Sequence, residues 1–378
     1  MKTTKLILLS FFLISYSIHK TYAQGGAIEL MRAGQADANK LVSAYMKPLT
    51  DGFAASMSNG WFNTAKPHGL GGFDITGTFN FVGIDNGMKT FDAATIGLNT
   101  DINKPRLQIT NPNGTAISQT VYGANQKDPS KVSIVQNFMG YDTVVSSFSM
   151  PTGLGLKYGI GLINVQAAIG LGMGTEVMIR VTPSIKTDNF TINMFGFGLK
   201  HNLSHWIWKG NAKPPIDLSL VCGYNTLQGN YNLNGSYLAP EGAYPGALSL
   251  SDYKNSQQMN FTGKGFMYGA VVSRKISFLT LYAGATYVAN SVEMKMTGKY
   301  PITFFETDQT SSNFGQKIIL NMEDPVTLKS ELNFMKLTGG IRLKLGIFTL
   351  SGEYNYGKVN TLSAGLGINI QSLAPFKI

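Results

Sequence analysis

The feature that most restricts the fold of this chain is an alternation of apolar and polar residues with a period of two. It begins at residue 72 and returns many times. In the first such run the apolar residues are Phe73, Ile75, Phe79 and Phe81, and the polar residues are Asp74, Thr76, Thr78 and Asn80. Because successive side chains of a β-strand point to opposite faces, this pattern predicts strands with one apolar and one polar face.

Further runs predict about fourteen strands between residues 72 and 378. The clearest are 176–182, 292–300, 341–345, 348–355 and 362–370, and weaker ones lie near 89–98, 105–121, 143–150, 154–162, 190–199, 216–224, 266–275 and 279–288. Many runs last for about nine to eleven residues, the length that a tilted strand needs to cross a bilayer. Strands of soluble sandwiches are more often shorter.

Composition indicates a glycine-rich, charge-poor β protein, and the length and number of the strands favour a membrane barrel over a soluble domain. Only 14% of the residues are charged, against roughly 25% in ordinary soluble domains, and the chain holds 43 glycines. We therefore predict an all-β fold, a transmembrane antiparallel β-barrel of about 14 strands with an N-terminal amphipathic helix. The alternative is a soluble sandwich or lipocalin whose apolar faces turn inward.

One glycine-rich stretch, 153–174, has the length of a transmembrane helix. It carries seven glycines together with Lys157, Asn164 and Gln166, so its helix propensity is poor. We expect two strands joined by a short turn there. The long polar intervals near 98–142, 226–258 and 301–330 read as outward-facing loops.

Residues 1–23 have the form of a secretory signal peptide. Lys2 and Lys5 precede an apolar stretch, and Thr21, Tyr22 and Ala23 form a small-residue cleavage site. We therefore expect export and a location in the cell outer membrane. The single cysteine, Cys222, excludes an internal disulfide and a zinc site built from cysteines.

The segment 24–71 has a different character and is predicted to be a helical plug segment. Apolar or small residues recur there at spacings of three and four, at Leu30, Gly34, Ala38, Leu41, Tyr45, Leu49, Phe53 and Met57. Pro48 should kink or divide the helix, and Asn59 with Gly60 should end it. The segment either fills the lumen as a plug or packs beneath the barrel as a floor; the candidates for plug contacts are Tyr45, Pro48, Asn59, Gly60, Trp61, Asn63 and Lys66.

The polar faces of the clearest strands carry charges that would line the lumen. The candidates are Glu176, Arg180, Glu293, Lys295, Lys299, Arg342, Lys344 and Glu353. Positive charges exceed negative ones by two in this set, so an aqueous passage would mildly favour anions. The alternative is that these charges satisfy one another inside a packed interior.

No residue pattern indicates catalysis. Trp206 and Trp208 are spaced by two and predict an interfacial aromatic girdle rather than a ligand site. Ser204 and His205 are neighbours on a predicted strand and therefore point apart, and His201 and His205 would need a helix to share a metal. We expect no enzyme, no cofactor and no metal. The scattered positive charge also argues against nucleic acid as a partner.

Several short segments carry a family resemblance: 45–49 (YMKPL), 59–68 (NGWFNTAKPH), 71–74 (GGFD) and 196–201 (GFGLKH) with Trp206. With these the chain resembles an uncharacterised family of outer-membrane barrel proteins from Bacteroidota, and more distantly the long-chain fatty acid transporter (FadL-type) barrels. The distant resemblance implies a fourteen-stranded barrel, an N-terminal hatch and uptake of hydrophobic molecules. The hatch motif Asn-Pro-Ala of those transporters is missing from 59–68, where 63–65 (NTA) comes nearest.

From these patterns we expect a passive transporter or channel for a small hydrophobic or amphipathic solute, in contact with outer-membrane lipid. The alternative function is a structural or surface-interaction barrel that binds a partner protein or polysaccharide through its long loops.

Overall fold

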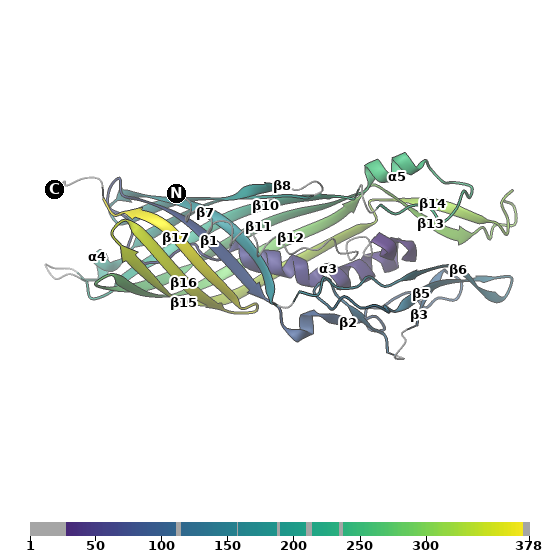
Figure 1. Cartoon of the computed structure of the whole chain (residues 1–378), viewed down its shortest axis with the longest axis horizontal. Helices are drawn as coiled ribbons and strands as arrows, with labels where there is room; N and C mark the ends of the chain where they lie inside the picture. The colour runs from purple at the N-terminus through teal and green to yellow at the C-terminus, as the bar shows by residue number, and fades with distance from the viewer. Residues whose placement is uncertain are drawn as a thin grey trace, which may run out of the picture.

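Ten antiparallel strands of the chain close into a β-barrel (Figure 1). The computed structural model describes residues 28–110, 115–156, 158–186, 190–208, 214–233 and 237–372, so the predicted signal peptide lies outside the described residues. Around the barrel the strands are β1 (Phe73–Gly83), β17 (Thr361–Ile370), β16 (Phe348–Tyr356), β15 (Val326–Leu345), β12 (Leu279–Thr297), β11 (Gln258–Ile276), β10 (Asp217–Asn232), β9 (Phe190–Asn202), β8 (Thr175–Lys186) and β7 (Gly159–Gly172), which returns to β1.

The two ends of the barrel differ in the length of their connections. At one end, the short-turn end, two residues or fewer separate β7 from β8, β11 from β12 and β15 from β16. The first barrel residue, Phe73, pairs with the last, Ile370, at this same end. At the other end, the long-loop end, residues 84–158, 233–257 and 298–325 connect the strands.

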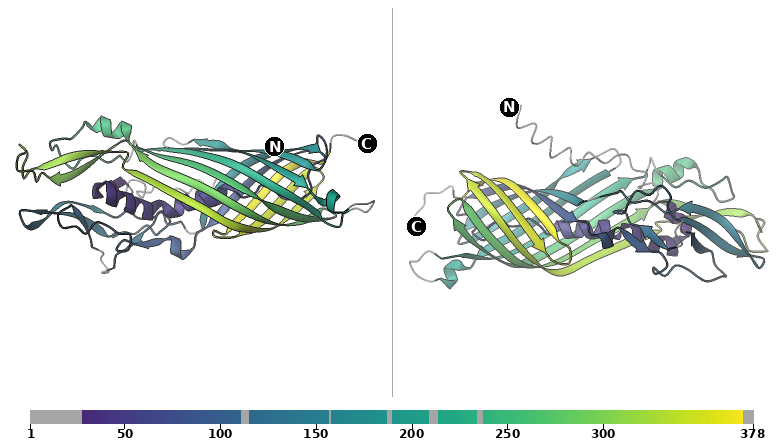
Figure 2. Two further views of the ribbon diagram at one scale, coloured as in Figure 1. Left: turned by 180° about the vertical axis from the view of Figure 1, so that it is seen from behind. Right: turned by 60° about the horizontal axis from the view of Figure 1, so that its bottom comes forward.

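The wall is taller on one side of the barrel than on the other. β10, β11, β12 and β15 have 16, 19, 19 and 20 residues, whereas β1, β16 and β17 have 11, 9 and 10. The tall strands continue beyond the closed barrel at the long-loop end, where the additional elements of the chain are gathered (Figure 2).

These additional elements form an outer half around the N-terminal helix. They are η1 (Leu30–Ala33), α3 (Gln35–Met57), η2 (Asn86–Met88), β2 (Thr90–Asp92), β3 (Arg106–Thr110), β4 (Ile117–Gln119), β5 (Lys131–Phe138), β6 (Tyr141–Ser149), α5 (Leu250–Ser256), β13 (Lys299–Phe305) and β14 (Lys317–Glu323). The core of this half contains Leu41 and Val42 of α3, Val132 of β5, and Met294 of the tall strand β12. A further short helix, α4 (Ser204–Ile207), lies in the connection at the short-turn end.

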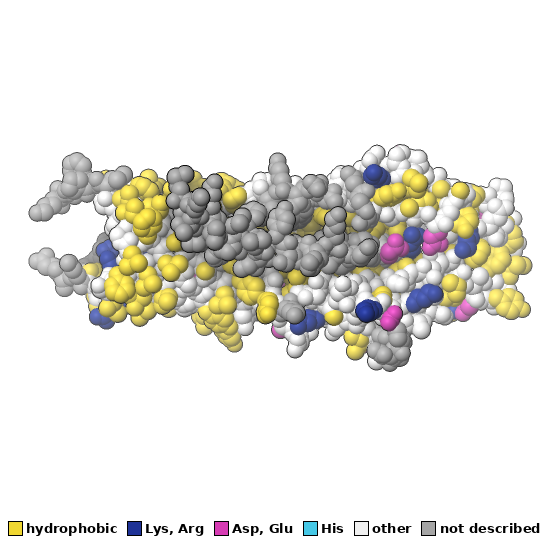
Figure 3. All heavy atoms as spheres, in the orientation of Figure 1, with side chains coloured by type: hydrophobic (Ala, Val, Ile, Leu, Met, Phe, Trp, Pro, Cys, Tyr) yellow, Lys and Arg dark blue, Asp and Glu magenta, His cyan; other side chains and the backbone are white. Residues whose placement is uncertain are grey.

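The barrel wall exposes its apolar face and buries its polar face. Ile75 is 49% exposed and Leu337 is 54% exposed, whereas their neighbours Asp74 and Thr338 are buried. This arrangement is the reverse of a soluble sandwich. Hydrophobic side chains gather over the barrel end of the molecule, and most visible charged side chains lie over the outer half (Figure 3).

The barrel has ten strands rather than the predicted fourteen. The runs near 89–98, 105–121 and 143–150 belong to small sheets of the outer half, and the runs 279–288 and 292–300 fall largely on one strand, β12. Alternation has the same period in a wall strand and in a surface hairpin, so it does not distinguish them.

The glycine-rich stretch 153–174 contains one strand, β7, instead of the two expected. Its glycines do not end the strand, because aromatic side chains of the neighbouring strand β1 pack over Gly159 and Gly161. A Cβ at Gly159 would lie 2.6 Å from the Phe81 ring, and one at Gly161 would lie 2.3 Å from the Phe79 ring.

Pro48 lies inside α3, which is a single helix and not the divided pair considered above. An interior proline costs roughly 3 kcal/mol. Tyr45 and Met46, beside Pro48, are buried in the core of the outer half, and this packing offsets the cost. Among the described helices, none combines the length and the apolar character that a membrane-spanning helix requires.

Candidate functional site

A chain segment between α3 and β1 runs through the lumen of the barrel. α3 enters from the long-loop end, where the amide of Asn225 donates a 2.8 Å hydrogen bond to the carbonyl of Met57. At the short-turn end the N–H of Gly69 donates to the carbonyl of Gln371 at 2.8 Å. Residues 58–72, the lumenal segment, therefore connect the two ends of the barrel through its interior.

Trp61 is the largest buried side chain of the lumenal segment, with an exposed fraction of 1%. Its indole lies against glycines of two neighbouring strands: a Cβ added to Gly198 or to Gly223 would lie 2.6 Å from the ring. On another side the guanidinium of Arg180 lies 4.0 Å from the ring centre. Because Gly198 of β9 and Gly223 of β10 have no side chains, they leave a slot in the wall that holds the ring.

Charged groups of the wall bind the main chain where the lumenal segment begins. Arg180 Nη1 donates to the carbonyl of Asn59 at 2.7 Å, and Lys336 Nζ donates to the carbonyl of Ser58 at 2.6 Å. The N–H of Gly60 donates to Glu353 Oε1 at 3.0 Å. Three strands, β8, β15 and β16, therefore hold this turn by charge-assisted hydrogen bonds, which are stronger than neutral ones.

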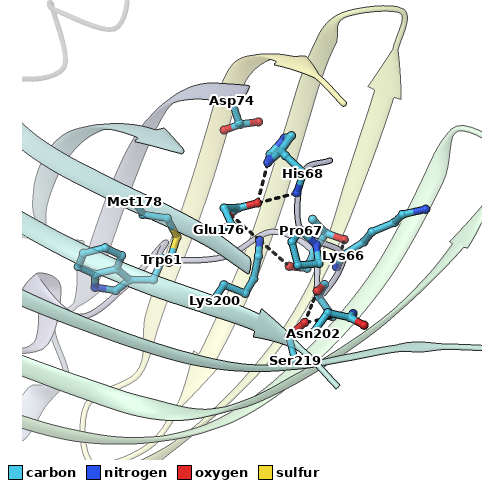
Figure 4. A network of polar contacts seen from close by, with 12 residues as sticks. Trp61, Lys66, Pro67, His68, Asp74, Glu176, Met178, Lys200, Asn202 and Ser219 are labelled. Carbon is cyan, nitrogen blue, oxygen red and sulfur yellow. Dashed lines mark hydrogen bonds and ion pairs between the residues drawn. The ribbon is translucent and has the colours of Figure 1, made fainter. Parts of the chain in front are cut away.

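A second polar network lies toward the short-turn end and centres on Glu176 (Figure 4). Glu176 Oε2 accepts the backbone N–H of His68 at 3.0 Å and lies 2.6 Å from His68 Nδ1. Its other oxygen lies 2.8 Å from Lys200 Nζ. Asn369 contacts both the ring of His68 and the carboxylate of Asp74. His68 thereby fastens the lower part of the segment to β8 and β17.

Hydroxyl and amide groups of the wall hold the middle of the segment. Ser273 Oγ lies 3.2 Å from Thr64 Oγ1 and accepts the N–H of Ala65 at 3.0 Å. Gln166 Nε2 donates to the carbonyl of Trp61 at 3.2 Å. Inward residues of most barrel strands therefore contact this one segment.

One cavity beside the lumenal segment has a volume of about 20 Å³. It is lined by the segment from Gly60 to Thr64, by His68 and by polar wall residues that include Thr76 and Glu353. A single water needs at least about 10–15 Å³ by this measure. At this point the segment and the wall leave room for about one water.

The predicted lumen-facing charges divide into two groups. Glu176, Arg180, Arg342 and Glu353 are buried inside the barrel, and Lys344 is half-buried and donates to Asn369 near the short-turn end.

The other three do not face the lumen. Glu293 and Lys295 pair at 2.8 Å on the outer face of β12, and Lys299 lies 4.0 Å from Glu323 in the β13–β14 hairpin. At that level the inward face of β12 is apolar, with Val292, Met294 and Met296 fully buried. There the strand has left the closed barrel, and its inner face packs in the core that surrounds α3.

Sequence reasoning missed Lys200, Lys336 and His68 as lumen residues. The same period-two pattern contains the signal for Lys336, because its neighbours Met335 and Leu337 are exposed on the outer wall. Lys200 likewise follows the exposed Leu199. His68 lies outside any periodic run, so no comparable signal exists for it.

The remaining plug candidates lie in different surroundings. Tyr45 is buried in α3 and its hydroxyl donates to the carbonyl of Thr152 at 2.9 Å. Burial raises the pKa of Tyr45 above its usual range. The pKa of Tyr122 nearby is also raised, mainly by burial and to a smaller extent by the negative charge of Asp51. Asn63 is half-buried, and Lys66 is exposed with its side chain directed away from the Glu176 network (Figure 4).

The tryptophans predicted for the girdle lie at the short-turn end. Trp206 is 62% exposed on α4, and Trp208 is the half-buried residue that follows this helix. The expected strand is therefore one turn of helix here.

Ser204 and His201 each form a hydrogen bond with a neighbouring strand. Ser204 Oγ accepts the N–H of Leu218 at 2.7 Å, and His201 Nδ1 lies 2.9 Å from Thr175 Oγ1. The side chain of His205 lies outside the described residues. Within the described part of the chain, no group of three or more His, Cys, Asp or Glu side chains has the geometry to hold a metal ion.

Comparison with known proteins identifies a family. A family model described as a family of unknown function (DUF6588) matches residues 1–370. No curated protein matches the chain.

Solved structures with some likeness include three bacterial barrels. The translocator domain of the autotransporter NalP from Neisseria meningitidis is 9% identical, with a TM-score of 0.28 over 89% of this chain and 99% of that one. The transport unit of the autotransporter AIDA-I from Escherichia coli is 11% identical, with a TM-score of 0.28 over 86% and 99%. A TodX monoaromatic hydrocarbon channel mutant is 7% identical, with a TM-score of 0.24 over 80% and 67%. At these scores none supports an argument about fold or function.

Proposed function

Because the chain belongs to a family of unknown function (DUF6588), we propose a function from its own structure. The protein is an outer-membrane β-barrel that is closed by its lumenal segment. It passes a small polar or amphipathic solute when this segment moves.

A change of chemistry along the tall strands supports insertion in a membrane. On the outer face of β12, Leu281 and Tyr287 are followed by Glu293 and Lys295, while the inner face changes from the buried Asn290 to the buried Met294. β10, β11 and β15 show the same change on their outer faces. The apolar part of β12, residues 279–289, has the length that a tilted strand needs to cross a bilayer.

The unequal ends of the barrel support its orientation. Outer-membrane barrels have short periplasmic turns and longer extracellular loops. The short-turn end therefore faces the periplasm and the outer half faces the outside. In this orientation α3 approaches the lumen from outside the cell.

The observation that carries the transport proposal is the way in which the lumen charges are paired. Arg180, Lys336 and Glu353 bind main-chain atoms of residues 58–60. Burying charge is costly, and apolar residues of similar size often serve a permanently packed interior as well or better. A charged wall suits a lumen that fills with water in another state, in which these groups are hydrated.

The solute class follows from the two environments along the route. The lumen wall is polar and charged, whereas the core around α3 is rich in methionine, including Met31, Met46, Met294 and Met296. Because the lumen wall is polar, a solute that passes it should carry a polar part, so an amphipathic solute fits better than a purely hydrophobic one. The lumen carries four buried cations and three buried anions, Arg180, Lys200, Lys336 and Arg342 against Asp74, Glu176 and Glu353.

Flux through liposomes tests this function. The double variant Lys336→Met with Glu353→Gln removes wall contacts of residues 58–60 and should admit small polar solutes faster than the wild type. Lys329→Met, an exposed charge on the outer face of β15, is the matched control and should behave as wild type. Flux equal to that of empty liposomes for the wild type and the double variant would contradict transport.

A second candidate, surface interaction, is favoured by the far tip of the outer half. Met139 and Tyr141 of the β5–β6 hairpin are 73% and 78% exposed. The centre of the Phe138 ring lies 5.8 Å from the ring centres of both Phe305 and Phe314. Exposed apolar groups of this kind mark interaction sites. This function predicts that Met139→Ser with Tyr141→Ser abolishes retention on purified surface polysaccharide while solute flux stays unchanged; unaltered retention would reject it.

A further inference from the structure

A groove crosses the outer wall of the barrel over β15, β16, β17 and β1. Its volume is about 670 Å³, and it is a shallow hollow that is widely open to the surroundings. Gly339, Gly352 and Ala364 contribute to its floor, and Ile341, Tyr354 and Leu362 rise beside them. Because the exposed apolar residues of this wall surround it, the groove opens toward the lipid in the proposed orientation.

The groove exists because side chains are missing at adjacent positions. Gly352 pairs with Ile341 on β15 and with Ala364 on β17, and Gly339 pairs with Tyr354. A Cβ at Gly339 or at Gly352 would meet nothing within 4 Å. Phe79 and Phe81 of β1 also line the groove, and their rings lie against the glycines of β7.

Two polar groups follow the lining residue Tyr354 along the chain, toward the long-loop end. Tyr356 continues the outward row of Tyr354 and is 61% exposed, and Lys358 follows it as an exposed cation. An apolar groove below a tyrosine and a lysine matches the arrangement of a membrane lipid, in which acyl chains lie below a phosphate.

We infer that this groove binds one phosphate-bearing lipid of the surrounding membrane, with an acyl chain against Gly339 and Gly352 and the phosphate near Lys358. Adjacent strands lie about 4.8 Å apart, so the floor, which spans β15, β16 and β17, is about 10 Å wide. A flexible acyl chain enters a groove of this width, whereas the convex wall of a second barrel does not reach its floor. The inference requires a membrane-embedded barrel but not transport.

Native mass spectrometry of the full chain in mild detergent, with added phosphatidylglycerol as the probe, tests this site. The wild type should retain one lipid, and Gly339→Leu with Gly352→Leu should lower the retained fraction about tenfold by filling the groove. Gly77→Leu is the matched control, because Gly77 is also an exposed wall glycine, with only a backbone oxygen near its Cβ position at 3.8 Å. Lys358→Gln should weaken retention several-fold.

Heat-dependent gel mobility of each variant verifies that its barrel is folded. Equal retention by the double leucine variant and Gly77→Leu would overturn the site. Loss of retention with unchanged solute flux would support the lipid site while leaving it separate from transport. Binding of a second copy of the chain in place of lipid would also overturn it.

Discussion

The guanidinium of Arg180 lies 4.0 Å from the centre of the Trp61 ring and donates from Nη1 to the carbonyl of Asn59, two residues earlier in the chain. One wall residue thereby holds both a side chain and a main-chain atom of the lumenal segment. Cation–π contacts gain strength when both groups are withdrawn from water. Displacement of the segment must break the two contacts together.

Trp61→Ala is predicted to loosen the lumenal segment and to destabilise the protein. Truncating a fully buried tryptophan costs about 3–5 kcal/mol, and the loss leaves Arg180 without its ring. The midpoint of urea unfolding should fall, and planar-bilayer recordings should show more frequent openings. Trp206→Ala removes an exposed indole and should have a much smaller effect on both; identical behaviour of the two variants would contradict the assigned role of Trp61.

Gly223→Val should expel the indole from its slot. The added Cβ would lie 2.6 Å from the ring, and overpacking of this kind costs about 1–3 kcal/mol. With Trp206 and Trp208 replaced by Phe, Trp61 is the only tryptophan of the chain, so its fluorescence emission reports the slot. Gly223→Val should shift the emission to longer wavelength, and Gly77→Val on the outer wall should not. Unshifted emission in Gly223→Val would show that the ring does not depend on this glycine.

Lumen charge predicts the ion preference of the open state. Arg180, Lys200, Lys336 and Arg342 outnumber the buried anions by one, so reversal potentials in a salt gradient should show a mild preference for anions. Lys336→Met should reduce that preference and increase open probability, because it also removes the hydrogen bond to Ser58. A wild-type preference for cations would reject this account of the lumen.

Cysteine labelling tests the direction in which the chain threads the barrel. In a Cys222→Ala background, Ala36→Cys at the start of α3 and Met139→Cys at the outer tip should react with a membrane-impermeant maleimide on intact cells. Both positions are exposed. Met173→Cys, in the turn between β7 and β8, is 93% exposed and should react only after the outer membrane is opened. Labelling of Met173→Cys but not of Ala36→Cys on intact cells would reverse the proposed orientation.

Local pattern predicted much of the wall but not the number of its strands. The two faces of β1 follow directly from the alternation around Phe73 and Asp74, because period two is a local property of a strand. The strand count failed because the outer half also contains alternating hairpins. The prediction that Glu293 and Lys295 face the lumen failed for a related reason. The outer face of β12 changes from apolar to charged along the strand, and alternation does not mark where the strand leaves the closed barrel.

The lumen contacts were less predictable because they join distant parts of the chain. Lys336 and Ser58 are 278 residues apart, and Glu353 and Gly60 are 293 apart. The sequence does identify Asn59 and Trp61 as candidates for plug contacts in the segment before the first strand. The wall residues that contact Trp61 and Asn59 are determined by the register between the barrel strands, which a single sequence does not specify.

The most direct test of the gated lumen is a reversible lock between the segment and the wall. Thr64 Oγ1 and Ser273 Oγ lie 3.2 Å apart, so Thr64→Cys with Ser273→Cys, in the Cys222→Ala background, places two thiols within reach of a disulfide. Planar-bilayer recordings should show no openings under oxidising conditions and wild-type openings after reduction, with either single cysteine variant insensitive to redox conditions. Equal conductance in the oxidised and reduced double variant, with the disulfide verified by mass spectrometry, would contradict the claim that the lumenal segment closes the passage.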